Sequence, residues 1–95
     1  MENLLKIPCL SEDIELRQDD GKHRLYHRFR NKALILENDV TVDIAKGIDG
    51  VNSIDGIVEM MMEKYEVSVS ELENDVGELL SILEKEDFIV YLTDD

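Results

Sequence analysis

The 95-residue sequence contains one cysteine, one proline, no tryptophan, three tyrosines and two phenylalanines. A single cysteine excludes an internal disulfide, and the scarcity of aromatic side chains leaves Leu, Ile, Val and Met to build the core. The longest uninterrupted apolar run, from Phe88 to Leu92, is far too short to span a membrane. We therefore expect one cytoplasmic domain, without a signal peptide or a membrane span.

Positive charge is also scarce, because ten Lys and Arg accompany 23 Asp and Glu, for a formal net charge of −13. Five of those ten bases lie between Lys22 and Lys32, a stretch without acids. An acidic chain repels nucleic-acid phosphates, so we expect no nucleic-acid partner. The basic cluster has two interpretations: a charged strand that resists edge-to-edge aggregation, or a docking rim for the acidic side chains of a partner.

Alternation and turn signals predict a meander of three antiparallel strands over residues 12–37. Asp20-Gly21 is a strong hairpin signal, and residues 33–36 are expected to form the third, most apolar strand. The middle strand is expected to place three residues on one face: Leu25, His27 and Phe29. Residues 1–11 are interpreted as a lead-in segment, because Pro8 and Ser11 interrupt regular structure.

The apolar period then becomes helical, which predicts three helices within residues 38–87. Their expected N-caps are Asn38 or Asp39, Ser53, and Ser68 with Glu71 in a capping box. The apolar stripes of the second and third helices are Ile54, Ile57, Val58, Met61, Met62 and Tyr65, and Leu72, Val76, Leu79, Leu80 and Leu83. Residues 88–92 form a possible closing strand. The expected fold class is α+β, with the helices on one side of a small sheet.

No catalytic or metal-binding pattern is evident. His23 and His27 are four apart on a predicted strand, hence ~13 Å apart, and no third zinc ligand accompanies them. Cys9 has no rigid histidine base nearby and is expected to be an inert thiol. The acids fall on solvent faces of helices and form no evident acid–base pair. We therefore expect no enzymatic activity, no cofactor and no metal.

The third strand, Ala33 to Leu36, is the last strand of the meander, which favours a position at the sheet edge. An edge strand exposes unpaired N–H and C=O groups that an extended peptide can complete. The third helix would form the other wall of the groove. The sequence thus favours binding of an extended peptide.

Several segments, in this order over roughly residues 8–92, match a known family pattern: Pro8, Ile14-Glu15-Leu16, Asp20-Gly21, Ala33-Leu34-Ile35-Leu36-Glu37-Asn38, Ile48-Asp49-Gly50, Ser53-Ile54, Ile57-Val58, Lys64-Tyr65-Glu66-Val67, Leu72-Glu73-Asn74-Asp75-Val76, Leu79-Leu80, Leu83 and Phe88-Ile89. The chain resembles PqqD, the peptide chaperone family of pyrroloquinoline quinone biosynthesis, and the PqqD-like domains called RiPP recognition elements.

The resemblance implies a three-stranded sheet and three helices, similar to a winged helix-turn-helix. It also implies that the leader of a ribosomally made precursor peptide adds as an antiparallel strand to the third strand. The docking strand would be Ala33, Leu34, Ile35 and Leu36, and the cleft wall Asp75, Val76, Leu79 and Leu83. From the basic cluster we add Arg28, Arg30 and Lys32 as candidates to meet acidic leader residues.

The expected partners are therefore the precursor peptide and a separate maturation enzyme. The family resemblance favours a radical-SAM enzyme, with a leader protease or a cyclase as alternatives. An exposed edge strand can also pair with itself, so a monomer and a homodimer both stay open.

Two other classes of protein compete with this interpretation. Residues 50–60 resemble the second helix of an acyl carrier protein, in which Ser53 would carry phosphopantetheine. However, Asn52 replaces the usual Asp, and the preceding segment is predicted as strands rather than a long helix. A winged-helix nucleic-acid binder is the second alternative. Its recognition helix would have to carry five acids against DNA: Glu71, Glu73, Asp75, Glu78 and Glu84.

Overall fold

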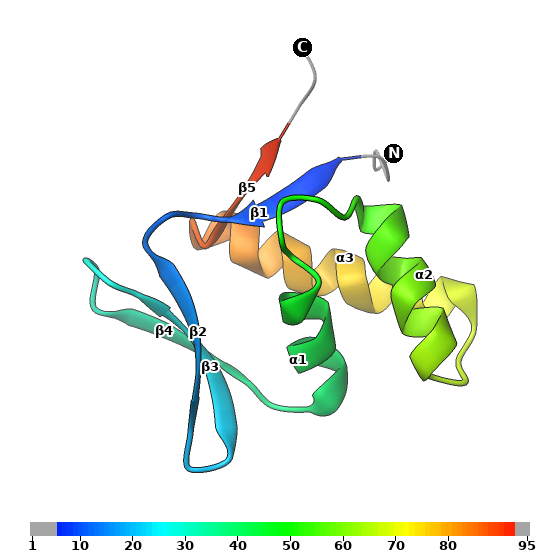
Figure 1. Ribbon diagram of the computed structural model, residues 1–95, viewed down its shortest axis with the longest axis horizontal. Coiled ribbons are helices and arrows are strands. Elements are labelled where there is room, and N and C mark those ends of the chain that lie inside the picture. Colours follow the sequence, from blue (N-terminus) through cyan, green and yellow to red (C-terminus); the bar gives the residue numbers. More distant parts are fainter. Residues whose placement is uncertain (1–5, 93–95) are drawn as a thin grey trace.

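The structure, a computed structural model, describes residues 6–92. The elements run in the order β1 (Ile7–Leu10), β2 (Ile14–Asp19), β3 (Lys22–His27), β4 (Lys32–Leu36), α1 (Asp39–Lys46), α2 (Ile54–Lys64), α3 (Val69–Lys85) and β5 (Ile89–Leu92). A three-stranded sheet lies on one side and the helices on the other (Figure 1). The expected α+β class, with a three-stranded antiparallel sheet followed by three helices, is confirmed.

The meander has the strand order β2-β3-β4 with antiparallel pairing throughout. Its first turn is the predicted one: Asp20 and Gly21 both have positive φ, 52° and 77°, as a two-residue hairpin turn requires. The prediction for Phe29 was wrong. Strand β3 ends at His27, opposite Lys32, so Phe29 lies in the loop between β3 and β4, exposed to solvent.

The segment at residues 7–10 is a strand rather than an irregular lead-in. β1 pairs antiparallel with β5, the closing strand expected near residues 88–92. Pro8 fits because it belongs to the side of β1 that faces away from β5, where a missing N–H breaks no ladder bond. Its carbonyl accepts a hydrogen bond from the Gly50 N–H at 3.3 Å, which ties β1 to the loop before α2.

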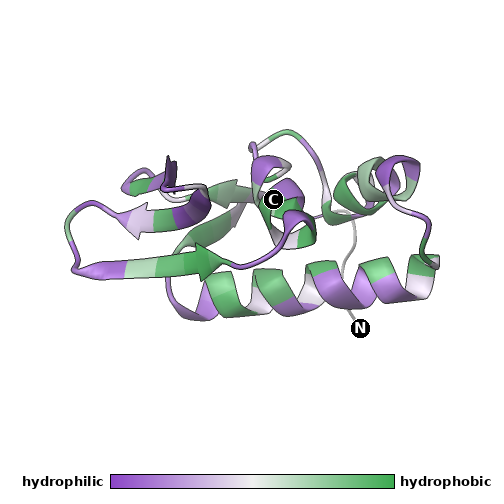
Figure 2. Ribbon diagram, turned by 90° about the horizontal axis from the view of Figure 1, so that it is seen from below, coloured by the Kyte–Doolittle hydropathy of each residue, from purple (hydrophilic) through white to green (hydrophobic). Residues whose placement is uncertain are grey.

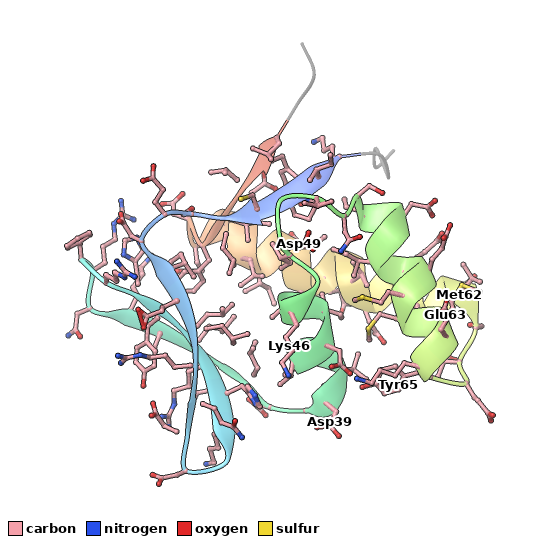
Figure 3. All side chains as sticks on the ribbon, in the orientation of Figure 1. Asp39, Lys46, Asp49, Met62, Glu63 and Tyr65 are labelled. Atoms are coloured by element: carbon pink, nitrogen blue, oxygen red, sulfur yellow. The ribbon has the colours of Figure 1, made fainter. Side chains whose placement is uncertain are left out.

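One core joins the inner face of the meander to the helices. The sheet contributes Ile14, Leu25 and Leu36. The predicted stripe of α3 is confirmed, since all five of its apolar residues are buried. Hydrophobic and hydrophilic residues alternate along α3 in Figure 2, as expected for a helix buried on one side. Met62 was wrongly placed in the core: it lies on the outer side of α2 (Figure 3) and is exposed.

The helices begin where the sequence predicts. Asn38 is the N-cap of α1 and forms a reciprocal capping box with Thr41. Ser53 and Ser68 cap α2 and α3 by accepting hydrogen bonds from the N–H groups of Gly56 and Glu71. Within residues 6–92, no helix is both long enough and apolar enough to cross a membrane.

Candidate functional site

Strand β4 is an edge strand, and within residues 6–92 no other strand pairs with its second, open side. The hydrogen-bond pattern follows from one contact, because the Arg28 N–H donates to the carbonyl of Asp13, the residue directly opposite it, at 2.8 Å. Hydrogen-bonded pairs alternate along antiparallel strands. The main-chain N–H and C=O groups of Leu25 on β3 therefore point toward β4, where they pair with Leu34. The main-chain groups of Ala33 and Ile35 therefore point to the open side.

The two faces of β4 also differ in their side chains. Leu34 and Leu36 are on the inner face, where Leu36 is buried and Leu34 packs against the core. Ala33 and Ile35 are exposed on the outer face. The predicted docking strand thus combines a free main-chain edge with an apolar inner face, as strand addition requires.

Two ion pairs connect this edge to the end of α3. The Lys32 ammonium lies 3.1 Å from the Glu86 carboxylate and 3.4 Å from the Glu86 carbonyl. The Arg30 guanidinium lies 3.2 Å from Asp87. β4 therefore begins beside the C-terminal end of α3 and leads toward α1 (Figure 1).

Three bases predicted to meet a partner are thus paired within the chain. Arg28 contacts Glu15 on β2 at 3.3 Å, and Arg30 and Lys32 are held as just described. All three pairs are solvent-exposed, and exposed pairs of this kind are worth only about 0–1 kcal/mol. An acidic partner can therefore displace the internal acids at little cost.

The residues of α3 that were predicted to form the cleft wall differ in their exposure to solvent. Asp75 is exposed, whereas Val76 and Leu83 have no exposed surface and Leu79 is buried with 7% of its surface exposed. Sequence reasoning missed Ile82, which is 48% exposed. Ile82 is four residues before Glu86 and three after Leu79, so the three share one side of the helix. The end of this side that carries Glu86 is linked to β4 by the ion pair between Lys32 and Glu86.

A separate hollow of about 620 Å³ lies along the other side of α3. Its lining includes Gly77, Leu80 and Tyr91 but no residue of β4. It is also acidic, because Glu73, Glu78 and Glu84 contribute to it. The α3 helix thus presents beside β4 a stripe of Asp75, Leu79, Ile82 and Glu86, in which Ile82 is the exposed apolar residue, and an acidic hollow on its other side.

Among the described residues, the groups with a shifted pKa lie in α1, at the C-terminal end of α2 and in the loop before α2. The Tyr65 hydroxyl donates to the Asp43 carboxylate, which lowers the pKa of Asp43 and raises the pKa of Tyr65 to about 12. N–H groups of Asn52 and Val51 donate to Asp49 and lower the pKa of that carboxyl. Both acids are held ionised by these hydrogen bonds. They stabilise α1 and the loop before α2 and do not lie at the β4 edge.

The structure places the other chemistry-bearing residues in structural positions. His23 and His27 occupy the inner face of β3, and the His27 ring lies near Phe88, with the ring centroids 6.4 Å apart and the planes tilted by 42°. Among residues 6–92, no three His, Cys, Asp or Glu side chains are grouped as a metal site would require. Ser53 caps α2 and follows strands and a short helix, an arrangement that does not fit an acyl carrier protein.

Comparison with known proteins supplies the family. The family model described as "Coenzyme PQQ synthesis protein D (PqqD)" matches residues 31–89, more than half of the chain. The fold matches the solved structure "Lasso peptide synthetase B1 complexed with the leader peptide" with a TM-score of 0.73 and 19% sequence identity, over 88% of this chain and 98% of that one. No match was found among curated proteins.

Fold and edge define a small α+β domain with an open, apolar edge strand beside a helix. The chain belongs to the PqqD family, as the sequence resemblance predicted.

Proposed function

We propose that this protein is a non-catalytic, cytoplasmic binding domain that captures the leader of a ribosomally made precursor peptide and presents it to a separate maturation enzyme. Membership of the PqqD family supports this function. So does the shared fold with lasso peptide synthetase B1, a protein whose solved structure contains its leader peptide. The observation that carries the proposal is the open side of β4.

The leader adds to β4 as an antiparallel strand. That orientation continues the pattern of the sheet and forms the more stable kind of ladder. The guest backbone pairs with the N–H and C=O groups of Ala33 and Ile35. Backbone pairing supplies affinity without demanding a particular sequence, so specificity must come from side chains.

Specificity comes from the inner face. Every second side chain of the guest points toward the helices, where it meets Leu34 and the α3 stripe with Ile82 and Leu79. Asp75 is at the far end of that stripe. Val76 and Leu83 pack in the core on the buried face of α3, and they would contact the leader directly only if α3 moved. Acidic leader residues replace the internal acids as the ion-pair partners of Arg28, Arg30 and Lys32.

The mechanism is capture rather than chemistry. Holding the leader raises the effective concentration of the core peptide near the enzyme that modifies it. A radical-SAM enzyme is the first candidate for that partner, with a leader protease or a cyclase as alternatives. The domain acts as a monomer or a homodimer.

Amide hydrogen exchange tests strand addition residue by residue. The probe is a synthetic peptide with the leader sequence of a precursor from the same organism. On binding, exchange at the Ala33 and Ile35 amides should slow at least about tenfold, because each gains a hydrogen bond. The Leu34 amide, already directed at β3, is the internal control and should change little. Saturable binding without protection at residues 33 and 35 would exclude this edge.

A further inference from the structure

The loop between β3 and β4 carries an exposed aromatic side chain that packing does not explain. Phe29 is 79% exposed and has an exposed arginine on either side, Arg28 and Arg30. This loop projects from the end of the sheet that is remote from α2 (Figure 1). Aromatic and arginine side chains dominate the energetic centres of protein interfaces, and this loop carries both.

The loop is constrained by the two paired strands that it joins, β3 up to His27 and β4 from Lys32, although its tip is exposed. Arg28, the first residue of the loop, pairs with Glu15, and Arg30, near the end of the loop, pairs with Asp87. Residues 26–33 line an open hollow of about 460 Å³. A short loop between two paired strands loses little conformational entropy when a partner binds. The geometry thus presents Phe29 on a prepared support rather than on a free coil.

The position of the loop indicates which partner it serves. This step rests on the proposed function. A guest paired antiparallel to β4 runs opposite to it, so its C-terminal end leaves the edge at Lys32, the first residue of β4. The segment that follows a leader therefore emerges beside residues 28–31. An enzyme that acts on this segment must approach the same end of the sheet.

We infer that residues 28–31 dock the separate maturation enzyme, with Phe29 inserted in an apolar pocket that is rimmed by acidic residues. The acidic rim follows from the local charge, since Phe29 lies between Arg28 and Arg30, and the acids of the enzyme would pair with whichever of these arginines the leader does not occupy. A second copy of this protein also has acidic surfaces, but a copy seated here would cover the path of the emerging peptide.

The test begins by identifying the neighbour of residue 29. The photo-crosslinking amino acid benzoylphenylalanine replaces Phe29 in the producing cells, in the presence of the precursor peptide. Val51, which is 76% exposed and is in the loop before α2, is the matched control position. The expected product joins residue 29, and not residue 51, to an enzyme that modifies the peptide. Cross-links only to the leader or to a second copy, or none at all, overturn the inference.

Affinity then decides whether the contact matters. The captured enzyme is purified, and its Kd is measured for the leader complexes of the wild type, Phe29→Ala and Val51→Ala. Phe29→Ala should weaken enzyme binding at least about tenfold and leave leader affinity unchanged, whereas Val51→Ala should change neither. Equal enzyme affinity for all three overturns the inference while leader capture stands. If the wild type fails to bind its leader, the proposed function itself fails.

Discussion

Lys32, the first residue of β4, places its ammonium 3.1 Å from the carboxylate of Glu86, the residue that ends α3. This contact brings the open edge of the sheet to one end of the α3 stripe that contains Ile82. The pair defines the geometry of the proposed site, because a guest strand on β4 would have the helix on its inner side. The distance does not imply a large contribution to stability, since exposed ion pairs are worth about 0–1 kcal/mol.

Proline at either outward-facing position of β4 should weaken strand addition without unfolding the domain. Ala33→Pro or Ile35→Pro removes an N–H that points to the open side, where proline is tolerated in an edge strand. Leader affinity measured by fluorescence polarisation should fall at least about tenfold, the equivalent of one lost hydrogen bond of about 1.4 kcal/mol.

Gln18→Pro is the matched control for both prolines. Gln18 also lies on an outward-facing position, but on β2 at the opposite edge of the same sheet. Its substitution should leave leader affinity within about twofold of the wild type. If it weakens binding as much as the β4 prolines do, while circular dichroism shows a folded domain, then the leader does not depend on the β4 edge.

Neighbouring residues of α3 should separate stability from binding. Leu83 has no exposed surface, so Leu83→Ala should reduce the free energy of unfolding by about 2–5 kcal/mol. Ile82 is 48% exposed, and Ile82→Ala should change stability by less than about 1 kcal/mol but weaken leader binding several-fold. Denaturant titration and fluorescence polarisation measure the two effects. Unchanged leader affinity in Ile82→Ala would remove the α3 stripe from the site.

The fold was predictable where its signals are local. Alternation along the meander, the Asp20-Gly21 turn and the apolar period of α3 each lie within a few neighbouring residues. The pairing of β1 with β5 was not predictable in this way, because it joins Cys9 to Val90 across most of the chain. A four-residue strand with a proline carries almost no alternation of its own.

The candidate site was predicted less completely than the fold. The edge position of β4 follows from strand order, but the outward direction of Ala33 and Ile35 depends on the hydrogen-bond phase between β2 and β3. The family resemblance placed Val76 and Leu83 in the cleft wall, although the apolar period of α3 already assigns both residues to the core. Ile82 is apolar but does not belong to the buried core face of α3, and only its relation to Glu86 and β4 indicates a binding role.

Releasing Arg30 from its internal acid should speed the capture of an acidic leader. Asp87→Asn removes the negative charge 3.2 Å from the Arg30 guanidinium, and asparagine tolerates the positive φ of 65° found at this position. The association rate measured by stopped flow should rise, and more so at low salt. The control Arg30→Gln should lower that rate. If neither variant changes the rate, the leader does not meet Arg30.

The hydroxyl of Tyr65 should make stability depend on pH at both ends of the scale. It donates to Asp43 on α1, toward which Tyr65 points from the end of α2 (Figure 3). This bond lowers the pKa of Asp43 from its usual 3.8. Folding is therefore favoured while Asp43 is ionised, and this contribution is lost as the pH falls from about 3.8 through the lowered pKa.

At high pH stability is instead lost as the pH rises, because the same bond raises the pKa of Tyr65 from 10.0 to about 12. Its contribution is complete below pH 10 and is lost between pH 10 and 12. Tyr65→Phe should therefore lower Tm at pH 7, and its difference from the wild type should shrink below pH 3.8 and above pH 10. Tyr26→Phe, which loses an exposed bond to Asp19 on the sheet, controls for removal of a hydroxyl as such. A Tm difference for Tyr65→Phe that stays constant from pH 3 to pH 11 would show that Asp43 and Tyr65 are not coupled.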